Sequence, residues 1–511
     1  GMARDILSAF REKFILCAEQ GMDELILLLP AGAADVHKPS AYSLELSEGL
    51  KPTEKIFPLG MLGGSRFTFL PQLGFNFTEI GHCCYSFKDT GKCSCSFPPN
   101  RSNGLYFVAI WAAHSMWYGG NTATHGPVIR PVDENGKAQE GPWIDYLAPT
   151  MRDYIRACVK ASVEGSVNEK PKRNIMLWNI DNEWEPVLNY SPLAMAGFQR
   201  ELEHIYGGDI GKLNEVWKTK YRSFCEILPP KGEEYLEKPA AWLAWHDYSE
   251  NTFVDFIGSY LGWVREFDPE HRPAVLKSTQ CSSIEMNYIV RSHMANLAKL
   301  ADRTRRTSDG WIGIDMYGNT DRNAYETSYI YNCIRPTATQ QAAGEPEGRI
   351  FFAETNNHAG PGFQFAATYW RTLAHGMRGV DFFVLGRYKS NWDNLTFSFI
   401  DGYDGQPRDR MFYASRWANM IHRSEEFWHD ALPAKNVPKI AILMPQRDVL
   451  LSMETNRSRW DYSVNNRLNV FTRLRDAGYW VDVLPYTKLT DDYLARYRAL
   501  IPVSYTHLRA H

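Results

Sequence analysis

The sequence predicts an α/β protein whose main part is a (β/α)8 (TIM) barrel. Eight short apolar runs recur along the chain, and each ends in polar residues, as buried parallel strands do. Helical patterns lie between many of these runs, which favours βα units over hairpins. With 511 residues, 44% of them hydrophobic, the chain is long enough for a large barrel and a second domain.

The predicted strands follow one another within residues 51–430, the range that we assign to the barrel. They cover residues 55–61, 74–81, 105–111, 174–184, 272–277, 311–317, 349–354 and 380–385. We expect helices at 148–163 and 242–267, whereas the short, Cys-rich connection between the second and third strands leaves a helix there in doubt. Residues 1–50 are expected to form an N-terminal extension that packs on the barrel.

A second unit begins at Pro438. Strand patterns at 439–444, 478–484 and 498–503 surround a helical pattern at 465–477, which predicts a small open parallel sheet. Because three strands make only part of such a fold, we expect residues 438–511 to be a partial, C-terminally truncated α/β domain. Residues 504–511 carry no pattern and are not expected to be native sequence.

The composition excludes two classes of partner. The 56 basic and 59 acidic residues give a net charge of −3, which predicts neither nucleic-acid binding nor binding to an anionic membrane. No apolar run approaches the roughly 18 residues of a membrane span, and residues 24–30 are too short for a signal peptide. Nine scattered cysteines favour a reducing compartment, hence the cytoplasm, although a leader could have been removed.

Residues 174–184 carry the clearest chemical signal. The apolar run ends in Asp181-Asn182-Glu183, and in α/β folds the carboxyl end of a strand carries the chemistry. Trp178 and Trp184 flank these groups, as suits an acid/base catalyst that acts on a sugar. The alternative is that Asp181 or Asn182 caps the N-terminus of a helix.

Glu354 ends the seventh predicted strand, so two carboxyl groups would face each other across the barrel axis. Such a pair predicts glycosidic bond cleavage, with one carboxyl protonated and the other ionised. A gap of about 5–5.5 Å would make the enzyme retaining, and about 6.5–9.5 Å would make it inverting.

Several segments resemble clan A glycoside hydrolases, and most closely the family 42 β-galactosidases. Residues 178–184 are similar to the acid/base motif, 198–217 to the segment that follows it, and 354–380 to the nucleophile region and eighth strand. The tail resembles the start of the family's flavodoxin-like second domain. The resemblance runs from about residue 55 to 503.

This resemblance implies the roles of individual residues. Glu183 would be the acid/base, Glu354 the nucleophile, and Asn182 a hydrogen-bond partner of the sugar 2-hydroxyl. Tyr317 would orient the nucleophile, or else simply close the core. Arg387 would lie near the site, or else form a surface salt bridge. Asn356, in the nucleophile region, would contact substrate.

The sequence also departs from the family pattern. No arginine stands where the family has the one that grips galactose; Trp143 lies near that place and would stack on the sugar instead. Residues 392–397 lack the Glu and His that hold the distal hydroxyls in the family. Residues 189–194 lack the zinc-binding cysteines of many members, so we expect no metal and no cofactor. His114, at the end of the third strand, is either a substrate contact or a structural histidine.

A separate cluster comprises His82, Cys83, Cys84, Cys93 and Cys95. Its spacing fits zinc poorly, which favours free thiols or a redox pair. For the whole chain we expect a retaining exo-β-glycosidase that acts on an oligosaccharide or β-glycoside, with a homotrimer implied by the resemblance. A β-mannosidase or β-glucanase, or a non-catalytic carbohydrate-binding barrel, remains an alternative.

Overall fold

The computed structural model describes most of the barrel and part of the C-terminal unit. The described residues are 57–62, 70–82, 105–110, 129–139, 144–168, 175–182, 187–277, 297–317, 328–329, 332–336, 348–356, 362–386, 397–400, 407–430, 439–444, 457–485 and 488–503. Among them, no helix combines the length and the apolar character that a membrane span requires.

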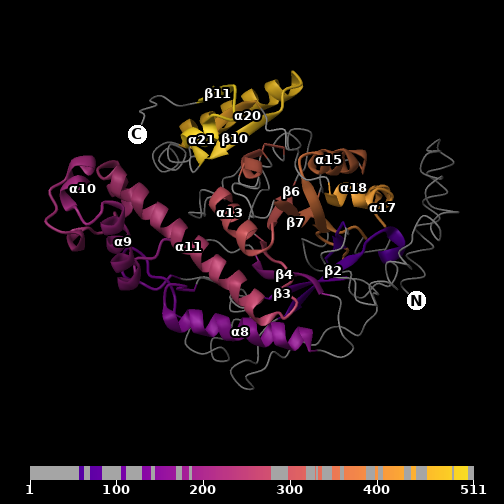
Figure 1. Ribbon diagram of the computed structural model, residues 1–511, viewed down its shortest axis with the longest axis horizontal. Helices are drawn as coiled ribbons and strands as arrows, with labels where there is room; N and C mark the ends of the chain where they lie inside the picture. Colours follow the sequence, from indigo (N-terminus) through magenta and orange to yellow (C-terminus); the bar gives the residue numbers. More distant parts are fainter. Residues whose placement is uncertain are drawn as a thin grey trace.

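Eight parallel strands form one sheet, at the places where the sequence predicts them (Figure 1). They are β1 (Leu59–Met61), β2 (Phe77–His82), β3 (Leu105–Ile110), β4 (Ile175–Asn182), β5 (Ala274–Lys277), β6 (Trp311–Tyr317), β7 (Arg349–Asn356) and β8 (Met377–Phe382). The pairing order is β5-β4-β3-β2-β1-β8-β7-β6. The two ends of this order, β5 and β6, contact each other, so the sheet closes into a barrel.

The closure between β5 and β6 depends on Gly313. A Cβ atom built on this residue would lie only 2.4 Å from the carbonyl oxygen of Leu276 in β5. A side chain would therefore push the two strands apart, and glycine lets the backbones approach.

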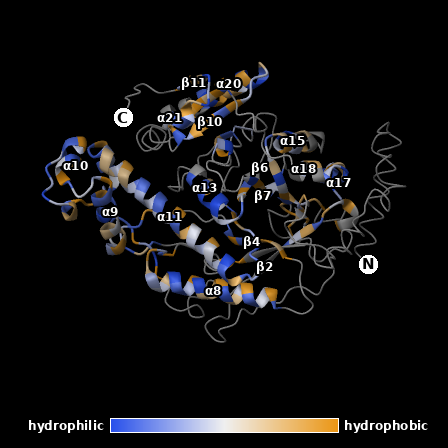
Figure 2. Cartoon of the chain, viewed as in Figure 1, coloured by the Kyte–Doolittle hydropathy of each residue, from blue (hydrophilic) through white to orange (hydrophobic). Residues whose placement is uncertain are grey.

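Amphipathic helices cover the barrel. The largest are α8 (Pro149–Val167), α11 (Pro239–Phe267), α13 (Leu297–Thr307), α15 (Gly362–Ala374) and α17 (Asp409–His422). Two short helical segments, η2 (Leu70–Leu73) and α18 (Glu425–Asp430), lie at either end of the barrel sequence. Figure 2 shows hydrophobic and hydrophilic residues interleaved along α8, as expected for a helix with one buried face. The two helices predicted at 148–163 and 242–267 are confirmed as α8 and α11.

A small subdomain follows β4. It contains α9 (Pro192–Ile205), α10 (Ile210–Trp217), η3 (Phe224–Glu226) and η4 (Gly232–Leu236), and it has a hydrophobic core of its own around Trp245 of α11. Ser191 caps α9 by accepting from the backbone of Ala194, and Asp209 caps α10. This subdomain packs around the N-terminal end of α11, on the left of Figure 1.

The C-terminal unit is a three-stranded parallel sheet in the order β10-β9-β11. Its strands are β9 (Ile440–Met444), β10 (Val481–Pro485) and β11 (Ala499–Ile501), with helices α20 (Arg457–Asp476) and α21 (Asp491–Leu494). The predicted β-α-β pattern is therefore confirmed, whereas the flavodoxin-like assignment, the truncation and the domain limits 1–50, 51–430 and 438–511 stay predictions.

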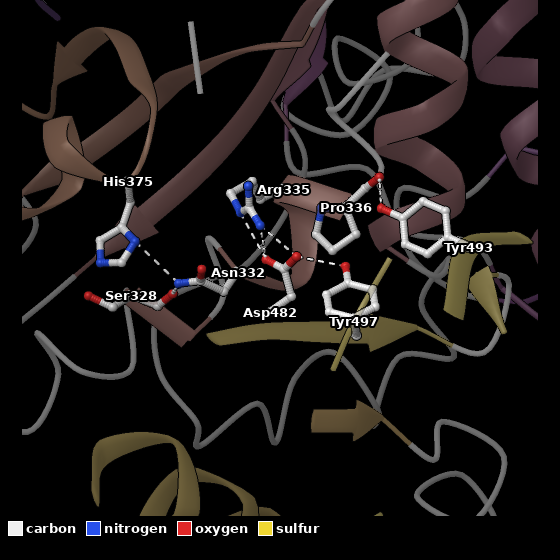
Figure 3. Close-up of polar contacts among 8 residues, drawn as sticks. All are labelled: Ser328, Asn332, Arg335, Pro336, His375, Asp482, Tyr493 and Tyr497. Carbon is white, nitrogen blue, oxygen red and sulfur yellow. Dashed lines mark hydrogen bonds and ion pairs between the residues drawn. The ribbon is translucent and has the colours of Figure 1, made fainter. Parts of the chain in front are cut away.

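A buried ion pair joins this unit to the barrel part (Figure 3). The Arg335 guanidinium donates hydrogen bonds of 2.5–2.8 Å to both oxygens of Asp482 in β10, and Tyr497 also donates to Asp482. Tyr493 of α21 donates to the carbonyl of Pro336. Beside this contact, Asn332 donates from its side-chain amide to Nδ1 of His375.

Candidate functional site

The described part of the site lies at the carboxyl ends of β4, β5 and β7. Lys277 is the last residue of β5, and its Cα partner across the sheet is Asn182, the last residue of β4. Glu354 lies near the end of β7, opposite Asp315 of β6. This is the end of a βα barrel where active sites are built.

An irregularity in strand pairing precedes both Asn182 in β4 and Glu354 in β7. The register between β4 and β5 shifts between Ile180 and Asn182, which leaves Asp181 as an extra residue with a φ of 53°. The register between β6 and β7 shifts in the same way, which leaves Ala353 unpaired ahead of Glu354. Because side chains alternate between the two faces of a strand, an inserted residue changes the direction of those that follow.

An ion-pair network occupies the barrel lumen below this end. The Lys277 Nζ atom lies 2.6 Å from Oε2 of Glu79 in β2 and 3.1 Å from Oε2 of Glu354. The side chains of Lys277 and Glu79 are 2% and 1% exposed, whereas that of Glu354 is 11% exposed. Glu354 is therefore the most exposed of these three side chains.

Burial and charge act against each other in this network. Burial by itself would lower the pKa of Lys277, but the negative charges of Glu79 and Glu354, with smaller effects of Asp315 and Asp381, raise it well above its ordinary value. Burial raises the pKa of Asp381 well above the usual range, and the charge of Glu79 raises it further. Burial also raises the pKa of Glu79, against the opposing effect of Lys277. We therefore expect Lys277 to stay charged near pH 7.

The predicted site residues divide into two groups. Asn182 and Glu354 are described, and so is the backbone of Tyr317, whose Cα is paired with that of Asn356 at the ends of β6 and β7. Outside the described residues lie Glu183, His114, Trp143, Arg387 and the cysteines of the His82–Cys95 cluster. β4 runs to Asn182 and the next described helix starts at Pro192, while residues 183–186 lie outside the described residues, so the helix-capping alternative for Asp181 and Asn182 is not tested.

Two residues have surroundings that differ from the sequence-based expectation. Asn356 is fully buried, and its amide donates to the carbonyls of Phe383 and Phe397 and accepts from Arg410, so it holds the segment after β8. Trp178 is also fully buried, and its indole N–H donates to Asp268. It packs in the core and does not flank the polar strand end as a sugar-stacking surface.

Sequence reasoning missed Lys277 and Glu79 as members of the site. Both stand within otherwise apolar strand patterns, and a charged residue that breaks such a pattern was the available signal. The described residues contain no group of three or more His, Cys, Asp or Glu that could hold a metal ion. In chemical terms, the arrangement presents a carboxylate beside a buried ammonium group at the mouth of a barrel.

Comparisons with known proteins agree on one family. The family model described as β-galactosidase, glycoside hydrolase family 42, matches residues 120–416. The β-galactosidase Pbg of Clostridium perfringens is 31% identical over 134 residues, 24% of this chain and 18% of that protein. The β-galactosidase BgaA of Clostridium cellulovorans is 22% identical over 306 residues, which are 57% of this chain and 38% of that protein.

A solved structure agrees on the fold. The β-galactosidase from Bacillus circulans sp. alkalophilus superposes with a TM-score of 0.65 at 15% identity, over 88% of this chain and 67% of that one. Its likeness supports the α/β barrel fold alone. This chain spans less than two fifths of the length of the two Clostridium β-galactosidases. The family model, in contrast, matches more than half of this chain. The chain belongs to glycoside hydrolase family 42.

Proposed function

We propose that this protein is a retaining exo-β-glycosidase that removes terminal β-linked sugars by a double displacement. The observation that carries the proposal is the position of Glu354. Its carboxyl group lies at the catalytic end of β7, its side chain is 11% exposed, and an ammonium group lies 3.1 Å away. The two relatives reported above are named β-galactosidases, which supports a β-galactoside as the first substrate to test.

The mechanism assigns one role to each glutamate. Glu183 donates its proton to the glycosidic oxygen while a carboxylate oxygen of Glu354 attacks the anomeric carbon, so that the bond to the leaving group breaks and a glycosyl ester forms. Glu183 then takes a proton from water, whose oxygen attacks the same carbon and releases Glu354 as a carboxylate. Asn182 would bond the 2-hydroxyl of the sugar. Tyr317 and Arg387 are proposed to lie near the nucleophile.

A panel of nitrophenyl β-glycosides tests the proposal. We expect cleavage of at least one β-glycoside with retention at the anomeric carbon. Proton NMR of the first product, recorded before it mutarotates, measures the configuration. Glu354→Gln should lower kcat by a factor of about 10³ or more, because the covalent step loses its nucleophile. The matched control is Glu215→Gln on the exposed face of α10, which should leave kcat unchanged.

The panel also separates the alternatives. Preferential cleavage of β-mannosides or β-glucosides would replace the galactoside assignment, which the departures at Trp143 and at residues 392–397 leave open. If no glycoside is cleaved and Glu354→Gln still binds glycans as the unmodified protein does, the chain is a carbohydrate-binding barrel. Inversion at the anomeric carbon would refute the double displacement.

A further inference from the structure

Lys277 is the central charge of the barrel lumen. It ends β5, its backbone N–H donates to Oδ1 of Asn179 in β4 at 3.1 Å, and its side chain is 2% exposed. Both ends of this residue are therefore held, the backbone by β4 and the ammonium by carboxylates. Such a side chain has one position, and so does whatever it binds.

Four carboxyl groups face this single ammonium in the described part of the lumen. They come from four strands: Glu79 of β2, Asp315 of β6, Glu354 of β7 and Asp381 of β8. Among the described residues, Glu79 and Glu354 lie in direct contact with Nζ, at 2.6 Å and 3.1 Å. The ammonium is thus shared between a fully buried carboxylate and one that reaches the barrel mouth.

We propose that Lys277 is a positioning residue for the reaction. Its ammonium group is shared between Glu354 and Glu79, so that it keeps a charged partner when Glu354 reacts. The inference rests on the proposed function, in which Glu354 is the nucleophile. In the free enzyme, the contact of 3.1 Å with the ammonium holds the Glu354 carboxylate in place. When Glu354 becomes a neutral glycosyl ester, the ammonium keeps Glu79 as its partner, so no unpaired charge is left buried in the lumen.

The sharing also limits how strongly Lys277 stabilises Glu354. An ammonium paired with Glu354 alone would favour the ionised carboxylate most strongly, and would make it a weaker nucleophile. With Glu79 at 2.6 Å and Glu354 at 3.1 Å, the stronger contact goes to the residue that takes no part in the covalent step. Lys277 itself gains and loses no proton in either half of the reaction.

Removing Lys277 and removing Glu79 should move the acidic limb of the pH profile of kcat/KM in opposite directions. Lys277→Met removes the positive charge that lies 3.1 Å from Glu354, so the acidic limb of kcat/KM should move up by about one pH unit or more. Glu79→Gln removes a competing anion, so the limb should move down. A residue that only stabilised the fold would not give shifts of opposite sign.

Two further variants and a folding check complete the experiment. Lys277→Arg keeps the charge and should return the limb toward that of the unmodified protein. Lys299→Met serves as the matched control, because Lys299 pairs with Glu250 of α11 outside the lumen, and its limb should not move. Circular dichroism and thermal unfolding identify any variant that fails to fold. If Lys277→Met does not fold, the downward shift in Glu79→Gln and the unmoved limb in Lys277→Arg still test the inference.

A second readout needs no turnover. A water-soluble carbodiimide with glycine ethyl ester modifies protonated carboxyl groups, and peptide mass spectrometry measures the modification of Glu354 against pH. The midpoint should move up in Lys277→Met and down in Glu79→Gln. If both folded variants move it in one direction, or neither moves it, the inference is wrong. If these shifts occur but no glycoside is cleaved, the proposed function fails and the electrostatic role of Lys277 stands.

Discussion

The buried ion pair between Arg335 and Asp482 provides the sharpest test of how the C-terminal sheet is held. The two side chains are 3% and 1% exposed, and the guanidinium donates to both carboxylate oxygens. The perturbation is a double-mutant cycle of Arg335→Met and Asp482→Leu, so that each charge is removed alone and then both together (Figure 3).

The structure sets the expected magnitudes. Each single substitution leaves one charge buried without its partner, and such a loss costs about 3–5 kcal/mol. Burial already raises the pKa of Asp482, so in Arg335→Met this carboxyl should take up a proton and the cost should fall at the lower end. The double variant replaces both charges by apolar side chains, and should lie within about 1–2 kcal/mol of the unmodified protein.

Urea unfolding and hydrogen exchange measure these differences. Peptides from β9 and β10 should exchange faster in each single variant, and the exchange should return toward the original rate in the double variant. The surface control is Arg265→Met, because Arg265 pairs with Asp309 while the side chains are 44% and 54% exposed. That variant should lose no more than about 1 kcal/mol.

Two results would refute the reasoning about this pair. A cost below about 1 kcal/mol for Arg335→Met would mean that the pair does not hold the C-terminal sheet. A double variant as unstable as the sum of the single ones would mean that the two side chains act independently. In either case the contacts of Tyr493 and Tyr497 would have to hold the sheet instead.

Two further predictions concern stability. Burial raises the pKa of Glu425 from 4.5 to about 8. Between these two pH values the folded state holds a proton that the unfolded state has released, so the free energy of unfolding should fall as pH rises from 4.5 to 8. Glu425→Gln should remove that pH dependence in thermal unfolding at pH 5 and 8, and an unchanged slope would contradict the assignment. Gly313→Ala should lower the free energy of unfolding in urea by about 1–3 kcal/mol, because its Cβ would lie 2.4 Å from the carbonyl oxygen of Leu276. Gly262→Ala in α11, which has open space around it, is the control and should not lower it. Equal effects of the two variants would contradict the close approach of β5 and β6.

Much of the barrel could be predicted because its signals are local. Each buried parallel strand is an apolar run that ends in polar residues, and β4 and β7 carry this pattern without ambiguity. The strand ends then place Asn182 and Glu354 at one edge of the sheet, since parallel strands share a direction. The boundary of β8 was less certain, and the strand begins at Met377, earlier than the predicted 380.

The network around Lys277 could not be predicted, because it depends on contacts between residues far apart in the chain. Glu79 and Lys277 are 198 residues apart, and no local pattern relates them. The irregular pairing at Asp181 and Ala353 is also invisible to a strict alternation of side chains. Asn356, whose motif suggested a substrate contact, lies against Phe383, Phe397 and Arg410, which only the folded chain brings together.

The sequence by itself therefore determined the eight-stranded barrel, the edge of the sheet where chemistry occurs, and Glu354 as a residue at that edge. These follow from hydrophobic burial and strand direction, which are written in short stretches of residues. The tertiary structure decided which charge faces Glu354 and which side chains turn into the core. Those depend on the closure of the barrel, because a buried ammonium group takes the carboxylates that closure places within reach of it.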